Sequence, residues 1–261
     1  MPPNPCLITF DDGYRSNLTE AVPALREVGA TATFFVATAF TSQRRLYWWD
    51  RIAYLVHHAA GPTLALTYPV AREIAVADRA AARGALVALV KDTPGLELDR
   101  FLDELAAAAG VPWDAARERA LADELIMTWD EVRALRDAGM TVASHTSEHR
   151  VLETMPDDEL AADLRGARAD LARELDLDCR AIAYPVGRTI AVYPAVRAAV
   201  AAAGYRLGFT NASGTIDVRH PDRLDRLDLA RMAVDRDLPD ALFLGQLVSP
   251  RLGFTRTTTN V

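Results

Sequence analysis

The chain has 261 residues, of which 50% are hydrophobic, and its formal net charge is −7. A chain of this length can bury a substantial core, whereas its negative charge argues against nucleic acid or an anionic membrane surface as the main partner. The two cysteines, Cys6 and Cys179, are too far apart in sequence to suggest a disulfide framework or a zinc ribbon.

The N-terminal segment predicts neither a secretory leader nor a membrane anchor. "MPPNPCLITF" lacks a basic start followed by an apolar run of about 7–15 residues. No stretch of the chain approaches the ~18 continuous apolar residues of a membrane span. We therefore expect a cytoplasmic protein, whose oligomeric state the sequence leaves open.

Strand and helix patterns alternate along most of the chain. Runs of apolar and β-favouring residues predict short buried strands at 6–10, 31–38, 140–144, 180–185 and 205–210. Apolar residues at helical spacing predict helices at 16–29, 128–139, 155–177 and 192–204. Such alternation is typical of a parallel sheet, either open or closed into a barrel.

Residues 41–126 interrupt this alternation. They contain several Ala-rich segments with helical character, punctuated by prolines, and few candidate strands. No linker rich in Gly, Ser or Pro flanks them. We therefore interpret 41–126 as a helical insertion within a single domain that spans 1–261.

Two groups of chemically active side chains directly follow predicted strands. Asp11 and Asp12 follow the first strand, and His145 and His149 follow the strand at 140–144. Functional groups in parallel α/β sheets collect at the carboxyl ends of the strands. Either group alone is ordinary, because acidic turns and surface histidines are common. Together, one carboxylate and two imidazoles can supply the three protein ligands of a catalytic metal with an open position for water.

We therefore predict one divalent metal ion bound by Asp12, His145 and His149. Neighbouring side chains point in different directions, which leaves Asp11 free to take a proton from water. The charge of the metal also explains why two carboxylates can stand side by side at this point of the chain.

These motifs resemble those of the polysaccharide deacetylases, also called NodB-homology domains. "TFDDGY" at 9–14 is similar to the family's first motif, in which the first Asp is the base and the second a metal ligand. "SHTSEH" at 144–149 is similar to its second motif, with two metal-binding histidines. The resemblance implies an α/β fold, a distorted barrel of about seven β/α units with a helical insertion. It also implies that zinc or a similar ion is bound and that acetyl groups are removed from N-acetylated sugars.

A third stretch, "AYPVG" at 183–187, is similar to the family's third motif. The resemblance implies that Tyr184, Pro185 and Val186 form a wall of the substrate groove. It further implies that the backbone N–H of Val186 donates to the oxyanion.

The sequence also departs from the family pattern. Ala183 stands where many members have an arginine that orients the base, and Val186 stands where many have an aromatic residue. The late Leu-x-His motif has no match, and His220 is the only histidine near the C-terminal end. "LARMAV" at 229–234 resembles the final strand, which would place Arg231 near the site, although a surface ion pair is the ordinary expectation for such an arginine.

Trp48 and Trp49 are candidates for stacking against a sugar ring, because aromatic faces suit the apolar faces of sugars. Packing of the insertion is an equally good explanation for them.

Alternative functions remain open. "HTSEH" also fits H-x-x-E-H, the inverted zinc-protease pattern with Glu148 as base, although that pattern needs a regular helix. Two histidines and an aspartate also match the facial triad of non-haem iron oxygenases. A sugar-binding protein on a degenerate deacetylase scaffold would need no base, so Asp11 argues against it. We expect a zinc-dependent hydrolase that removes N-acetyl groups from a sugar or glycoconjugate.

Overall fold

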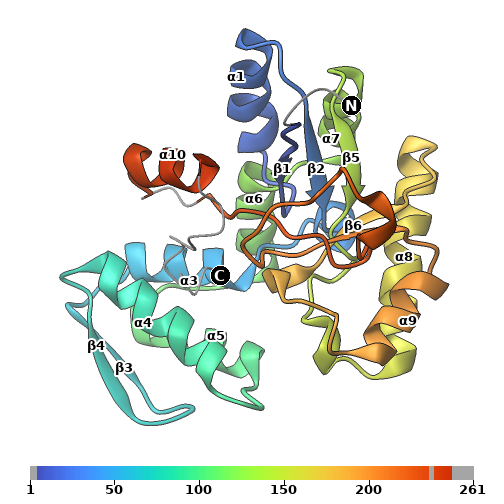
Figure 1. The fold of residues 1–261 in the computed structure, drawn as a ribbon. Helices are drawn as coiled ribbons and strands as arrows, with labels where there is room; N and C mark the ends of the chain where they lie inside the picture. The colour runs from blue at the N-terminus through green and yellow to red at the C-terminus, as the bar shows by residue number, and fades with distance from the viewer. Residues whose placement is uncertain (1–4, 235–237, 249–261) are drawn as a thin grey trace. The chain divides into compact units, whose positions relative to one another are not determined.

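The computed structural model describes residues 5–234 and 238–248 (Figure 1). The chain divides into two compact units. The first contains the described residues up to Gln43 and those from Leu125 onward, and the second is Arg44–Glu124. All of the predicted metal ligands belong to the first unit.

A parallel sheet of five strands forms the centre of the first unit. Its strands, in spatial order, are β1 (Ile8–Phe10), β2 (Ala32–Val36), β5 (Thr141–Ser144), β6 (Ala181–Ala183) and β7 (Leu207–Phe209). Every neighbouring pair is parallel, with Phe34 of β2 opposite Phe10 on one side and Val142 on the other. The carboxyl ends of all five strands therefore lie at the same edge of the sheet.

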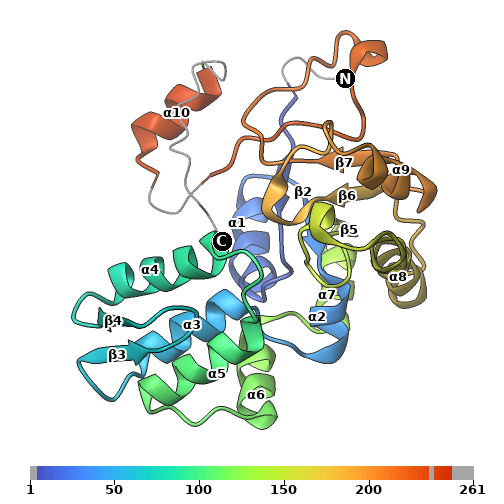
Figure 2. The same ribbon diagram turned by 90° about the horizontal axis from the view of Figure 1, so that it is seen from below.

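The helices of the first unit include the four that the sequence predicts, together with two short ones that it does not. The predicted four are α1 (Val22–Glu27, after a π-helical turn at Asn17–Ala21), α7 (Trp129–Asp137), α8 (Asp157–Leu175) and α9 (Pro194–Ala202), and the other two are α2 (Thr38–Gln43) and α10 (Asp240–Val248). Short 3₁₀ turns lie at Leu152–Thr154, Pro185–Gly187 and Pro221–Arg223. Helices α8 and α9 pack side by side (Figures 1 and 2).

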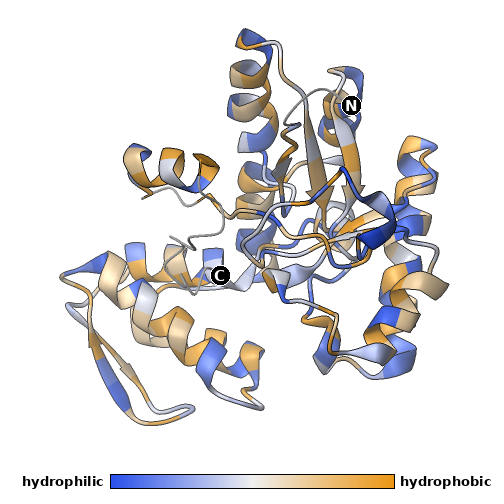
Figure 3. Ribbon diagram, viewed as in Figure 1, coloured by the Kyte–Doolittle hydropathy of each residue, from blue (hydrophilic) through white to orange (hydrophobic). Residues whose placement is uncertain are grey.

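Burial patterns explain why these segments fold as they do. Helix α8 buries Leu160, Leu164, Ala167 and Leu171, which recur every three or four residues along one face. Strand β2 is buried along its whole length, as expected for a central strand of a parallel sheet. In Figure 3 the helices accordingly carry polar and apolar segments in alternation. Helix α7 begins at the predicted capping box of Thr128 and Glu131.

The α/β barrel-like fold expected from the sequence is confirmed. The parallel sheet is curled into a half-barrel, to which the described residues contribute five strands. The expected last strand at 229–234 is reduced to a single parallel bridge between Phe209 and Leu229. Hydrogen bonds from Leu229 N to Gly208 O and from Thr210 N to Leu229 O hold this short segment beside β7.

The second unit is mostly helical and has its own core. Its elements are α3 (Trp48–His57), β3 (Thr63–Leu66), β4 (Arg72–Ala75), α4 (Arg79–Asp92), α5 (Leu98–Ala109) and α6 (Ala115–Leu125). The core is built from side chains such as Ile52, Leu86 and Phe101. The antiparallel β3–β4 hairpin was not predicted, because each strand has four residues and too little alternation to stand out. The interpretation of this region as an insertion within a single domain stays a prediction.

No helix among the residues that the structure describes is long and apolar enough to cross a membrane.

Strand β7 passes so close to Tyr184 that only glycine fits at position 208. A Cβ atom there would lie 1.9 Å from Tyr184 Oη and 2.8 Å from the carbonyl oxygen of Leu227. The Tyr184 hydroxyl is held in this position, because it donates a hydrogen bond to that same Leu227 oxygen at 2.7 Å. The bond ties β6 to the chain that follows β7.

We expect Gly208→Ala to lower the free energy of unfolding by about 1–3 kcal/mol, because the added methyl group must displace Tyr184 or the backbone at Leu227. The matched control is Gly166→Ala on α8, where a Cβ atom meets nothing within 4 Å. That variant should stabilise the helix by up to about 1 kcal/mol. Urea unfolding measures both, and equal effects of the two substitutions would contradict the close approach.

Candidate functional site

Asp12, His145 and His149 converge at the carboxyl edge of the sheet. Nε2 of His145 and Nε2 of His149 each lie 3.2 Å from Asp12 Oδ1. One ligand atom from each of the three residues lies within 4.8 Å of the other two. Asp12 follows β1 and the histidines follow β5, and these two strands flank β2 in the sheet. The structure thus brings together the three residues that the sequence predicts as metal ligands.

This donor set suits a divalent cation. Nδ1 of the buried His145 lies 2.9 Å from the carbonyl oxygen of Ala183, so it carries the proton and donates it. In the neutral imidazole this tautomer leaves the lone pair of His145 Nε2 available to a metal. One carboxylate oxygen and two imidazole nitrogens leave a fourth position of a tetrahedral ion open, as catalytic zinc sites require.

The electrostatics of the cluster also favour a cation. Burial alone would raise the pKa of Asp12, but the hydrogen bonds from His145 and His149 outweigh it and hold that pKa well below its usual range. Burial alone would lower the pKa of His145, but the negative charges of Asp11 and Asp12 outweigh it, and the pKa is raised. The surroundings of these residues therefore stabilise positive charge.

The backbone around the cluster is strained. Asp12, Thr146, His149 and Val186 have positive φ angles of 73°, 66°, 51° and 64°. This region is unfavourable for residues with a Cβ atom, and most of all for the β-branched Thr and Val. Such strain persists where surrounding contacts enforce it, and it concentrates at functional sites.

Asp11 is held by Arg231. Nη1 and Nη2 of Arg231 donate to Asp11 Oδ1 and Oδ2 at 2.8 and 2.7 Å. The remaining donors of the guanidinium bind Thr9 Oγ1, the Thr210 carbonyl and Asn211 Oδ1 at 3.1, 3.0 and 2.8 Å. All five N–H groups of the arginine are used, and its side chain is only 10% exposed. This is a shielded, two-pronged pair, unlike the surface ion pair that is the ordinary expectation for a lone arginine.

The third motif forms a tight turn at Pro185–Gly187. Tyr184 and Pro185 are buried, whereas Val186 is 38% exposed. The turn is fixed by hydrogen bonds from Gly187 N to Tyr184 O at 2.8 Å and from Asn211 N to Gly187 O at 2.7 Å. Because Asn211 also binds Arg231, the turn that presents the Val186 backbone is connected to the arginine that holds Asp11.

The remaining candidate residues are Trp48, Trp49 and His220. Trp48 and Trp49 belong to the second unit, where the buried Trp49 stacks on Tyr47 with ring centroids 4.4 Å apart. Contact of these tryptophans with a sugar stays a prediction. His220 is exposed in the charged loop before Pro221–Arg223, and its Nδ1 lies 2.9 Å from Asp217 Oδ2.

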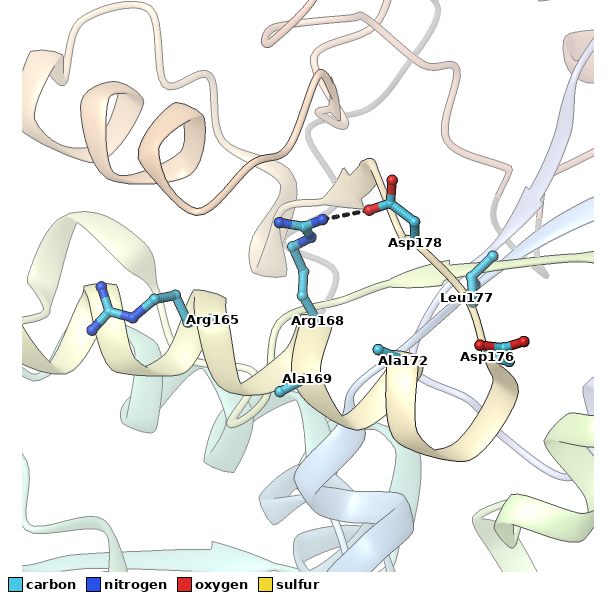
Figure 4. Close-up of a pocket in the computed structure, with 7 residues that line it drawn as sticks. All are labelled: Arg165, Arg168, Ala169, Ala172, Asp176, Leu177 and Asp178. Carbon is cyan, nitrogen blue, oxygen red and sulfur yellow. Dashed lines mark hydrogen bonds and ion pairs between the residues drawn. The ribbon is translucent and has the colours of Figure 1, made fainter.

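A separate hollow lies on the first unit, over the C-terminal half of α8 and the turn that follows it (Figure 4). Its lining residues are Arg165, Arg168, Ala169, Ala172, Asp176, Leu177 and Asp178. Arg168 donates to Asp178 Oδ1 at 2.6 Å and to the Cys179 carbonyl at 2.7 Å, which fixes the connection from α8 to β6. None of the predicted ligands lines this hollow.

Comparison with known proteins agrees with the motifs. The family model for polysaccharide deacetylases matches residues 1–84 and 100–208. The chain belongs to the polysaccharide deacetylase family. This membership supports a hydrolase that deacetylates carbohydrate.

Three solved structures show a similar fold at low sequence identity. The deacetylase PplD of Streptococcus pyogenes, solved with acetate, is 17% identical with a TM-score of 0.54, over 92% of this chain and 69% of that one. The BpsB deacetylase domain of Bordetella bronchiseptica is 19% identical with a TM-score of 0.52, over 90% and 73%. A de-N-acetylase of Aggregatibacter actinomycetemcomitans is 14% identical with a TM-score of 0.54, over 94% and 76%. The comparison with curated proteins finds no match.

We expect His149→Ala to bind divalent metal at least ~10-fold more weakly than the unmodified deacetylase, because it loses one of three ligands. His220→Ala is the matched control, since His220 lies in the same unit but pairs with Asp217. Elemental analysis after dialysis against zinc measures occupancy. Full zinc occupancy in the His149→Ala protein would contradict the ligand set.

Proposed function

We propose that this polysaccharide deacetylase is a metal-dependent hydrolase that removes N-acetyl groups from an N-acetylated sugar or glycoconjugate. The observation that carries the proposal is that two neighbouring aspartates have different partners. Asp12 lies against two histidines, whereas both carboxylate oxygens of Asp11 accept hydrogen bonds from Arg231. A site that only bound sugar would need no carboxylate positioned in this way.

A divalent cation, which we propose to be zinc, would polarise the acetyl carbonyl and lower the pKa of a water molecule to about 7. Asp11 takes the proton of the attacking water, since each of its oxygens retains acceptor capacity beyond the bond from Arg231. The Val186 N–H donates to the oxyanion that forms when water adds to the acetyl carbonyl carbon and the charge moves to the carbonyl oxygen. The C–N bond then breaks, which releases acetate and a free amine.

Arg231 acts as a positioning residue for Asp11. The family resemblance places a base-orienting arginine at position 183. Ala183 stands there instead, is fully buried, and accepts a hydrogen bond from His145 Nδ1 at its carbonyl oxygen. Arg231 reaches Asp11 from the segment after β7 instead. Its planar fork matches both carboxylate oxygens, which fixes the direction in which Asp11 accepts a proton.

The leaving amine needs a proton, and His220 is the only histidine of the sequence after His149. His220 is exposed and paired with Asp217. We therefore infer that Asp11 returns the proton it has taken from water, or that solvent supplies one. If the protein is cytoplasmic, its substrate is a small or nascent glycoconjugate.

The geometry argues against the zinc-protease alternative. That pattern requires His145 and His149 on one regular helix. Residues 145–149 form a loop in which Thr146 and His149 have left-handed backbone angles.

Acetate release from a panel of N-acetylated sugars tests the proposal, and Asp11→Asn should lose about 10²–10⁴-fold in kcat while it keeps its metal. Glu148→Gln should stay active, because Glu148 has no role in this mechanism. An active Asp11→Asn protein together with an inactive Glu148→Gln protein would contradict this mechanism and support the zinc-protease alternative.

Arg231→Lys should lower kcat by up to about 100-fold with metal content unchanged, because one ammonium group cannot hold both Asp11 oxygens. Arg188→Lys is the control, since the side chain of Arg188 is 64% exposed and meets Glu153 at 3.2 Å. Steady-state kinetics on a confirmed substrate separate kcat from KM. Equal turnover in the two variants would remove the positioning role.

A further inference from the structure

The loop that carries both histidine ligands, residues 145–149, bends without the hydrogen bonds of a helix or strand. Each of its N–H groups therefore needs another partner. Three of these partners are near the loop or on β2: His145 N donates to Val36 O at 2.9 Å, Thr146 N to Ser144 Oγ at 3.2 Å, and His149 N to Thr146 Oγ1 at 3.1 Å.

The two remaining N–H groups both donate to Asp163 on α8. Ser147 N lies 3.1 Å from Asp163 Oδ2, and Glu148 N lies 2.8 Å from Asp163 Oδ1. The carboxylate thus accepts from two successive peptide groups, one at each oxygen. Hydrogen bonds to an ionised acceptor are stronger than those between neutral groups.

The position of Asp163 in α8 is itself unusual. It is only 7% exposed and lies on the apolar face of the helix, between Leu160 and Leu164. A charged side chain is costly to bury unless its hydrogen bonds are satisfied. Its two backbone partners in the loop meet that requirement, which ties the loop to the helix.

The opposite side of the loop is held by α2. Thr38 N donates to the Thr146 carbonyl at 3.2 Å, and Ala39 N donates to the Ser147 carbonyl at 3.1 Å. The loop backbone is therefore fixed on one side through its carbonyl groups and on the other through its N–H groups. The contacts with α2 are made by backbone groups, whereas the two N–H contacts with α8 both depend on the side chain of Asp163.

This arrangement bears directly on the metal ligands. His149 is in the left-handed region at φ 51°, and so is Thr146 at φ 66°. Strained conformations persist only when their surroundings enforce them. Loss of Asp163 would leave two N–H groups without partners and would let the loop relax away from Asp12.

We propose that Asp163 is a positioning residue of the metal centre, which accepts the N–H groups of Ser147 and Glu148 and thereby directs His149 Nε2 toward Asp12. It acts through the loop backbone and not by contact with metal or substrate. The inference rests on the metal site of the proposed function, but not on the identity of the substrate.

The test is Co²⁺ binding to the full chain. Titration measures the Co²⁺ affinity, and the visible absorption spectrum of the bound Co²⁺ reports the geometry of its ligands. Asp163→Asn has nearly the same shape but replaces one acceptor oxygen with an NH₂ group that opposes a loop N–H. We expect its Co²⁺ affinity to fall about 10–100-fold, with an altered spectrum.

The matched control is Asp170→Asn on the same helix. Asp170 Oδ2 accepts a hydrogen bond from Thr38 Oγ1 at 2.8 Å, so the substitution also disturbs a bond between α8 and another element. It leaves the N–H groups of the histidine loop with their partners. Its Co²⁺ affinity and spectrum should match those of the unmodified protein.

Wild-type affinity and spectrum in a folded Asp163→Asn protein would overturn the proposal, and so would an equal loss in Asp170→Asn. If Asp163→Asn does not fold, Asp163→Glu decides the matter, because it keeps the charge and both acceptor oxygens. Co²⁺ affinity within about 10-fold of wild type in Asp163→Glu supports the proposal. A larger loss in that variant, whether folded or not, counts against it.

Acetate release distinguishes this inference from the proposed function. Normal Co²⁺ binding by the unmodified protein without acetate release from any N-acetylated sugar would defeat the proposed function and leave the role of Asp163 intact. If the enzyme releases acetate but its Asp163→Asn variant binds Co²⁺ normally, the proposed function stands and the role of Asp163 is defeated.

Discussion

Two adjacent carboxylates at the end of β1, which is exposed or half-buried along its length, repel each other unless each is compensated separately. In this protein the compensation comes from opposite sources: Arg231 holds Asp11, and His145 with His149 hold Asp12. The rest of the site depends on this arrangement. In the proposed mechanism it keeps one carboxylate available to a metal and the other available to a proton, although the two residues are neighbours in the chain.

The parallel sheet makes this compensation feasible. It brings the ends of β1 and β5 to either side of β2, so that one aspartate meets two histidines more than 100 positions later in the chain. β1 and β7 are the two edges of the sheet, and Arg231 binds both Thr9 on β1 and the Thr210 carbonyl just after β7. A side chain thus connects the two outer strands of the sheet, and the same side chain orients the proposed base.

The contacts around the histidine loop follow the same principle. Thr146 and His149 adopt backbone angles that the chain alone disfavours, and contacts from α2 and from Asp163 on α8 enforce them. Strain at the site is therefore compensated by elements that also pack the core. In this way the stability of the sheet and its helices supports the geometry of a cluster that would not form on an isolated loop.

The sequence by itself predicted the five strands of the sheet, helices α1, α7, α8 and α9, and the three residues of the Asp12/His145/His149 cluster. These features leave local signals: periodic apolar residues, and polar residues placed directly after strands. The sequence could not determine the partner of Asp11, since Arg231 is 220 positions away and a lone arginine has no distinguishing local pattern. Asp163 left a faint signal, a charge on the apolar face of a predicted helix, but no indication of its partner. Only the tertiary structure decided these pairings, because hydrophobic periodicity specifies which face is buried and not which groups meet there.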